Sequence, residues 1–489
     1  AYEKACSGLA RNTLFPTDKK KALFMKWMQR AGAVCLAAGL ALLSACGPSE
    51  AEQKQGAWDE FLSRTDEGHK TSVTQGTAPD LTAYPYPDTL AGTYDTQDPW
   101  YLDSGAGKST LTAQEAKEDA EALFQLLHDF YGGYGYFGGD EAFQPALEQV
   151  LNDLSGETMV SAKSLQQSLE GALSPLILDG HFAINGHYLC AAQRQNMYYV
   201  PDLYLDEAQA AAIDSAYVKP TIGPDGALAW CFAALSSDGS DLPEELGEYT
   251  GLAWTLAEVA PGAGTTVYER REAEGLTVLV NQVLSDVGTE GNSWYERMDQ
   301  LNTFADSGES YRDLPVFVID LRGNIGGQPA FARRWFEGFA GAAPSPCQST
   351  IIRWSPLNGY MEALGYPVPE EPGEPVIQKT DGAWVEQDSV IFCLTDYATA
   401  SAGEWFVGDL RTLEHVVFVG SNTCGATLMT NNQTYCLPHS GLSVSFGTSL
   451  MLTPDGNREE TGFQPDLWVP PQEALEAVSR LCEYYGLNP

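Results

Sequence analysis

The sequence is short of basic residues, of long apolar runs and of paired metal-binding cysteines. Its 27 lysines and arginines face 66 aspartates and glutamates, which gives a formal net charge of −39 over 489 residues. Such a chain repels the nucleic-acid backbone, so the charge argues against nucleic-acid binding. No lysine follows Lys379, so the C-terminal part offers no amine as a base. No CxxC pair occurs, so a zinc site is unsupported, and we expect neither a metal nor a cofactor.

The first 46 residues have the pattern of an export signal. Basic residues precede an apolar run from Ala31 to Leu43, which is too short for a comfortable membrane span. The run ends in Leu43-Ser-Ala-Cys46, which resembles a bacterial lipobox, whose cysteine is lipidated and becomes the mature N-terminus. We therefore expect an exported protein, anchored by a lipid on Cys46 to the outer surface of the bacterial cell membrane. The alternative is a plain secretory signal with an incidental cysteine.

Composition and periodicity divide the rest of the chain into four parts. Residues 47–108 are rich in Pro, Asp, Thr and Gly and predict a tether with an irregular lead-in. Residues 109–184 show the periodicity of a small helical domain, and residues 185–275 contain short runs typical of strands. In residues 276–489 strands alternate with helices, which predicts an α/β fold in which helices cover a sheet.

One stretch near residue 105 resembles part of a phosphate-binding loop. The fuller pattern needs a glycine where Leu102 stands, and it needs a preceding strand, which is absent. Thr112 and Glu115 instead have the spacing of a helix capping box. Nucleotide binding is therefore not expected.

A serine in the last part lies between a predicted strand and a predicted helix. The apolar run Val390–Leu394 predicts a buried strand, and apolar residues at helical spacing follow Ser401. At a helix N-terminus, free backbone N–H groups and the helix dipole stabilise developing negative charge. Small neighbouring residues leave room for a substrate carbonyl. An ordinary helix-capping serine has the same pattern, and these residues alone do not decide between the two roles.

Three segments, in this order, resemble the carboxy-terminal processing (tail-specific) serine peptidases and their relatives, which include the tricorn core protease: Asp320–Gly327, Thr399–Glu404 and Gly462–Asp466. The ordered set carries the resemblance, and no single motif does. It implies a catalytic core built as a spiral of ββα units, similar to Clp-type peptidases and crotonases. It also implies hydrolysis of peptide bonds through an acyl-enzyme, with Ser401 as the nucleophile.

The base that activates the serine differs between branches of this family. One branch uses a lysine after the serine, but here Ala426 stands at that place. The other branch, which includes the tricorn-like enzymes, uses a histidine from an Asp-x-His segment. Asp179-Gly-His181 resembles that segment, and His187 is its nearest competitor among the six histidines. The resemblance therefore implies that His181 is the base.

The resemblance also suggests the remaining site residues. Register on the Gly-Phe-Gln-Pro-Asp segment places a glutamate that orients the imidazole at Glu459, with Glu460 as the alternative. The backbone N–H of Ala402 would supply one donor of an oxyanion hole. The second donor would be Gly326 or Gly327, because glycines allow close backbone approach.

Three functions fit these observations. The first is a surface-anchored serine peptidase that acts on peptide or protein substrates, and it is the function we expect. The second is a catalytically inactive family member that binds peptides or another ligand at the surface, suggested by Ala426 and Glu460. The third, a purely structural lipoprotein, leaves the ordered motifs unexplained. The distance between Ser401 and His181 discriminates between the first two.

Overall fold

The computed structural model describes residues 49–87, 89–94, 100–102, 107–213, 216–287, 293–356, 358, 362, 367–370, 375–454, 456 and 458–487. Residues 1–58 and 59–489 group into two compact units. Apart from the start of the first helix, the architecture below is that of the second unit. The predicted export signal and Cys46 lie outside the described residues. Within the described ranges, no helix has the length and apolarity that crossing a membrane requires.

A helix occupies much of the segment that was predicted to be irregular. Helix α2 runs over Glu50–Thr74, so the structure differs there from the expectation for residues 47–108. Ser49 and Glu52 begin the helix with reciprocal hydrogen bonds, because the N–H of Ser49 donates to Glu52 Oε2 at 2.7 Å and the N–H of Glu52 donates to Ser49 Oγ at 3.3 Å. The helix contains no proline, and the prolines that suggested irregular structure lie outside it.

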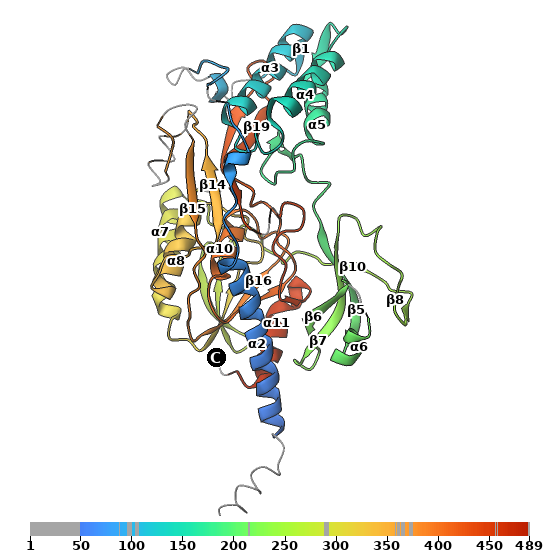
Figure 1. The fold of residues 1–489 in the computed structure, drawn as a ribbon, viewed down its shortest axis with the longest axis vertical. Coiled ribbons are helices and arrows are strands. Elements are labelled where there is room, and N and C mark those ends of the chain that lie inside the picture. Colours follow the sequence, from blue (N-terminus) through green and yellow to red (C-terminus); the bar gives the residue numbers. More distant parts are fainter. Residues whose placement is uncertain are drawn as a thin grey trace, which may run out of the picture. The chain divides into compact units, whose positions relative to one another are not determined.

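Three helices follow in the part of the chain that the periodicity predicted to be helical. They are α3 (Ala113–Phe130), α4 (Gly139–Asp153) and α5 (Ala162–Leu173), and they share one apolar core. Thr112 and Glu115 form the predicted capping box of α3. Figure 1 shows the three helices packed together at one end of strand β19. Two short strands pair antiparallel beside them, β1 (Thr110–Thr112) and β2 (Met159–Ser161).

The middle of the chain forms a four-stranded antiparallel sheet with the order β10-β5-β7-β6. This agrees with the strands predicted there. Short elements lie beside it. The bounds in this region are β5 Asn196–Leu205, α6 Glu207–Ala211, β6 Val218–Ile222, β7 Leu228–Ser236, β8 Glu245–Leu246, β9 Tyr249–Thr250 and β10 Thr255–Leu256.

A six-stranded sheet lies at the centre of the C-terminal part, with the order β11-β12-β13-β16-β17-β20. Its strands are parallel except β11, which pairs antiparallel with β12. Every residue of β13 and β17 is buried, which is typical of parallel strands covered on both faces. The bounds are β11 Glu269–Ala273, β12 Leu276–Val280, β13 Val316–Asp320, β16 Val390–Thr395, β17 Val416–Gly420 and β20 Leu467–Trp468.

Helices cover this sheet as the alternating pattern predicted. Helices α7 (Trp294–Asp306), α8 (Pro329–Ala340) and α10 (Ala402–Leu410) share an apolar core with β13, β16 and β17. Figure 1 shows α7 and α8 side by side. The closing helix α11 (Ala474–Tyr485) contacts β16 and β17. The structure is thus a mixed α/β fold.

A second sheet joins the two halves of the chain. Its order is β15-β14-β19-β3-β4, and β18 also pairs with β19. Strand β3 comes from the first half, and its Ile184 lies opposite Val444 of β19. This pairing brings the segment just before β3 next to the C-terminal part. The bounds are β3 Ala183–Ile184, β4 His187–Tyr188, β14 Gln348–Ile352, β15 Val376–Thr380, β18 Met429–Cys436 and β19 Ser443–Leu452.

Candidate active site

Ser401 lies in the short loop between β16 and α10, as the sequence predicted. Its backbone has φ +53° and ψ −120°, whereas an ordinary N-cap residue is extended. A positive φ is uncommon for a residue with a side chain and costs free energy that the surrounding structure has to offset. The backbone conformation of Ser401 therefore differs from that of an ordinary N-cap residue.

The glycine loop packs directly against this turn. A Cβ atom on Gly326 would lie 2.7 Å from the Cβ of Ser401, so only glycine fits there. The backbone N–H of Ala400 donates to the carbonyl of Asn324 at 2.7 Å, which ties the two loops together. Asn324 is fully buried, and its role had no signal in the sequence beyond its place in the motif. The glycine loop and the turn of Ser401 therefore pack closely against each other at the site.

His181 reaches the serine from the first half of the chain. Its Nε2 lies 2.9 Å from Ser401 Oγ, across 220 residues of sequence. The N–H of His181 donates to Asp179 Oδ1 at 2.8 Å, and the hydroxyl of Tyr131 donates to Asp179 Oδ2 at 3.0 Å. Asp179 therefore fixes the turn that presents the imidazole. His187, the competitor, lies on β4 with a side chain 73% exposed and contacts Glu170 at 3.4 Å.

Glu459 lies near the histidine turn, but its described contacts differ from the expected one. Its Oε1 accepts from the N–H groups of Thr427 (2.7 Å) and Leu428 (2.6 Å), and its Oε2 accepts from the N–H of Gly180. The Nδ1 atom of His181 is buried and has no hydrogen-bond partner among the residues that the structure describes. Glu459 thus holds the backbone next to the histidine. The neighbouring Glu460 is exposed.

Burial shifts the pKa values of His181, Asp179 and Glu459. The pKa of His181 is lowered to about 4, first by burial and then by the positive charge of Arg194. Burial also raises the pKa of Asp179 to about 6. The pKa of Glu459 is raised to about 8, mainly by burial and then by the nearby charge of Asp179. The imidazole of His181 is therefore neutral at physiological pH, so a ring nitrogen can accept a proton.

Glu404 is fully buried and connects the turn of Ser401 to a neighbouring loop through polar contacts, as its place in the serine motif led us to expect. Its carboxylate accepts from the N–H groups of Ser401 (3.0 Å), Gly425 (2.8 Å) and Ala426 (2.8 Å). It also accepts from the hydroxyl of Thr423 at 2.6 Å. The spacing of a serine and a glutamate three residues later, at a helix start, was the available signal. Glu404 joins the nucleophile turn to the loop after β17.

The expected oxyanion donors lie on either side of Ser401. Ala402 is the first residue of α10, where backbone N–H groups have no partner within the helix. Gly326 and Gly327 both have positive φ values, +90° and +136°. The N–H of Gly326 already donates to Asn324 Oδ1 at 2.9 Å. The two glycines are therefore not equivalent as donors.

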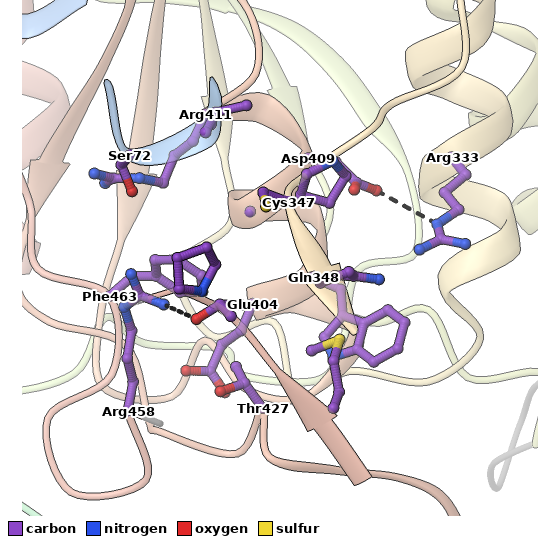
Figure 2. A pocket seen from close by; sticks show the side chains of 17 residues that line it. Ser72, Arg333, Cys347, Gln348, Glu404, Asp409, Arg411, Thr427, Arg458 and Phe463 are labelled. Atoms are coloured by element: carbon purple, nitrogen blue, oxygen red, sulfur yellow. Dashed lines mark hydrogen bonds and ion pairs between the residues drawn. The ribbon is translucent and has the colours of Figure 1, made fainter. Parts of the chain in front are cut away.

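A cavity of about 70 Å³ lies behind α10, and neither Ser401 nor His181 lines it. Figure 2 shows Arg333 directed at Asp409, with the two charged groups 3.7 Å apart. Glu404 also lines this cavity. The cavity therefore adjoins the hydrogen bonds between Glu404 and the turn of Ser401. Because neither Ser401 nor His181 lines this cavity, we do not assign it as the substrate site.

Among the residues that the structure describes, one group of side chains offers metal-ligand atoms close together. Asp66, Glu414 and His415 place these atoms within 4.8 Å of one another. The Nε2 atom of His415 already lies 3.6 Å from Asp66 Oδ2. None of these three residues is a predicted site residue, and the group does not enter the catalytic chemistry considered below.

Comparisons with known proteins show what part of the chain is similar to. Residues 289–469 match peptidase family S41, and no curated protein matches the chain. Similar solved structures include a putative peptidase from Parabacteroides merdae (16% identity, 75% of this chain and 96% of that chain, TM-score 0.39). They also include mature CPAF complexed with lactacystin (13%, 76% and 97%, 0.40) and the photosystem II D1 C-terminal processing protease (14%, 75% and 96%, 0.35). Over residues 289–469, more than a third of its length, the chain is thus similar to peptidase family S41, the kind of family that the sequence motifs resemble.

Proposed function

We propose that this peptidase cleaves peptide bonds through an acyl-enzyme on Ser401, with His181 as general base. The observation that carries the proposal is the 2.9 Å separation of His181 Nε2 and Ser401 Oγ. This distance lies within the range in which a base takes a hydroxyl proton. The low pKa of His181 keeps Nε2 free to accept that proton at neutral pH.

The reaction follows from this geometry in two steps. Ser401 Oγ attacks the peptide carbonyl carbon while its proton passes to His181 Nε2, and the N–H groups of Ala402 and Gly327 stabilise the resulting oxyanion. We favour Gly327 over Gly326 because the N–H of Gly326 is already used by Asn324. The imidazolium then gives its proton to the leaving amine. Water hydrolyses the acyl ester with His181 again as the base, which restores the free serine.

Glu459 acts in this proposal as a positioning residue. Its carboxyl group accepts hydrogen bonds from three backbone amides, and one of them belongs to Gly180, directly before His181. It therefore holds the histidine turn in place. Fixing the base within reach of the hydroxyl preserves a reactive geometry, which contributes strongly to rate.

We further propose the finer features that the resemblance implied. The catalytic core would follow the spiral ββα arrangement, and the protein would be exported and lipid-anchored through Cys46. Growth with a radiolabelled fatty acid tests the anchor. Label should enter the wild-type protein, and it should be absent after Cys46→Ser. Label that persists in the variant would overturn the anchor at this cysteine.

Fluorophosphonate labelling together with cleavage of a mixed peptide library tests the catalytic proposal. The wild-type protein should be labelled and should cleave peptides, and Ser401→Ala should lose both. Ser240→Ala, at an exposed serine in the middle of the chain, is the matched control and should retain both. Labelling that survives Ser401→Ala would remove Ser401 from the mechanism. A wild-type protein that binds peptides without cleaving them would favour the inactive peptide- or ligand-binding alternative.

A further inference from the structure

Three side chains from two distant segments of the chain converge at a place that the proposed mechanism does not use. Asp66 lies on helix α2, and Glu414 and His415 lie just before strand β17. One ligand atom from each side chain lies within 4.8 Å of the other two. Asp66 and His415 are 349 residues apart in sequence, and the group contains no cysteine. Neither a local motif nor cysteine spacing could therefore have predicted it.

The spacing of Asp66 and His415 is that of two ligands of one metal ion. His415 Nε2 lies 3.6 Å from Asp66 Oδ2, which is too long for a hydrogen bond. Two atoms bound to one tetrahedral zinc ion, each at about 2.0–2.1 Å, are separated by roughly 3.3–3.4 Å. The backbone N–H of His415 donates to the other oxygen, Asp66 Oδ1, at 2.8 Å. This bond fixes the carboxylate beside the imidazole and leaves Oδ2 available as a ligand.

The two carboxylates repel each other at this separation, and a cation between them would remove the repulsion. Glu414 is half-buried, and the side chain of Asp66 is only 13% exposed. Among the described residues, neither carboxylate forms an ion pair with a lysine or an arginine. A divalent ion would balance both negative charges, and the neutral imidazole would supply a third ligand without adding charge.

The imidazole of His415 has no hydrogen bond to any other residue in the described part of the chain. Its Nδ1 atom is buried without a partner, and its Nε2 atom has the 3.6 Å contact with Asp66. Buried polar atoms normally have a partner, so this ring calls for one. His69, one turn after Asp66 on α2, differs because its Nε2 lies 3.0 Å from Asp466 Oδ1. We therefore do not count His69 as a ligand. The side chain of His415 is 32% exposed, which leaves an ion a path from solvent.

We propose that Asp66, Glu414 and His415 bind one zinc ion, with water in the remaining coordination position. Two carboxylate oxygens and one imidazole nitrogen suit zinc, whereas calcium takes about six to eight oxygen ligands. The formal net charge of −39 attracts cations to the protein. The inference concerns the stability of the fold and does not rest on the proposed function of Ser401.

Such an ion would fasten α2 to the beginning of β17. Asp66 belongs to α2, and His415 directly precedes Val416, the first residue of β17. Strand β17 is buried throughout and lies between β16 and β20 in the six-stranded sheet. An ion that binds the folded chain and not the unfolded chain stabilises the fold by mass action. Zinc should therefore raise the melting temperature and protect α2 from local unfolding.

Zinc binding by the full-length, tag-free protein, after its metals have been removed with a chelator, tests the proposal. Isothermal titration calorimetry should find one zinc ion per chain, and the melting temperature should rise with zinc concentration. Calcium and magnesium at the same concentrations should give no comparable binding or rise. Trypsin cleavage after Arg64 and Lys70, which are exposed on α2, should become slower when zinc is present.

Variants then assign the ion to these three residues. His415→Gln and Asp66→Asn should each weaken zinc binding by at least about a hundredfold, since even an outer-shell partner is worth about ten- to a hundredfold. Glu414→Gln is the sharpest variant, because it keeps the contact between Asp66 and His415. With chelator present it should melt no lower than wild type, since one of two like charges is gone, and it should lose most of the rise that zinc causes. His439→Gln is the matched control, because the ring of His439 pairs with a single carboxylate, that of Glu118, at 2.8 Å.

Each outcome supports or overturns the inference. Zinc binding that is unchanged in His415→Gln and Glu414→Gln would place the ion elsewhere, for example at a cysteine, and would overturn it. Absence of zinc binding by the wild type would overturn it too and would leave Asp66 and His415 as an ordinary ion pair. Calcium binding as tight as zinc binding would overturn the choice of metal. If His415→Gln fails to fold, Glu414→Gln decides. Labelling of Ser401 is a separate measurement, so failure here leaves the proposed function intact.

Discussion

The imidazole of His181 and the hydroxyl of Ser401 meet at 2.9 Å because two distant segments pack on each other. Strand β3, two residues after His181, pairs with β19, and the turn before it lies on Ala426. A Cβ atom on Gly180 would come within 2.7 Å of the Cα of Ala426. Ala426 stands where the lysine-using branch is expected to carry its base. The histidine turn therefore packs on the site that the missing lysine leaves open.

Replacing the base tests its identity directly. His181→Gln should lower kcat by about a thousandfold, since general-base catalysis contributes on this order. The rate of labelling by a fluorophosphonate and the steady-state rate of peptide cleavage measure the loss. His187→Gln is the matched control, because His187 lies six residues away on an exposed strand, and its activity should stay at the wild-type level. Equal losses in both variants would contradict the assignment.

The pH dependence of kcat/KM reports the ionisation of the base in the free enzyme. An ordinary histidine would give an acid limb near pH 6.5. Burial and Arg194 lower the pKa of His181 to about 4. The imidazole is active when neutral, so activity on an uncharged peptide should persist as pH falls and should be lost only near pH 4. Circular dichroism at each pH controls for unfolding. An acid limb near pH 6.5 in a folded protein would contradict the burial of the base.

Alanine substitutions at Glu459 and Glu460 form a matched pair for measuring the free energy of unfolding. Glu459→Ala leaves three buried backbone N–H groups without their acceptor, each at a cost of roughly 1 kcal/mol or more. We expect its unfolding free energy to fall by about 3 kcal/mol, with a large loss of kcat, because the histidine turn loses its support. Glu460→Ala, at an exposed side chain, should stay within about 0.5 kcal/mol of wild type. Chemical denaturation measures both. A larger effect at Glu460 would reverse the assignment.

Gly326 tests the contact between the glycine loop and the nucleophile. Gly326→Ala would place a Cβ 2.7 Å from that of Ser401, in a backbone with φ +90° that side chains rarely adopt. We expect kcat to fall by about a hundredfold or more, since small misplacements of reacting groups are costly. Gly171→Ala, inside α5 with open space around it, should leave kcat unchanged. An active Gly326→Ala variant would show that the two loops are not tightly coupled.

The strands and helices that position the site could be predicted because each depends on local patterns. The apolar run Val390–Leu394 predicted β16, and the apolar spacing after Ser401 predicted α10, which the structure confirms. Helix α2 escaped prediction because flanking prolines dominated the composition of its segment. The Ser49–Glu52 capping pattern, three residues apart, was the signal that would have revealed it.

The sequence by itself determined the strand, turn and helix around Ser401, and the absence of a lysine to serve it. Only the tertiary structure decided that His181 lies within hydrogen-bond distance of this serine and that Glu459 binds backbone amides. These features depend on contacts between segments hundreds of residues apart, such as the 279 residues between Gly180 and Glu459. Local periodicity carries no information about such contacts, because it reports which face of an element is buried and not what covers that face.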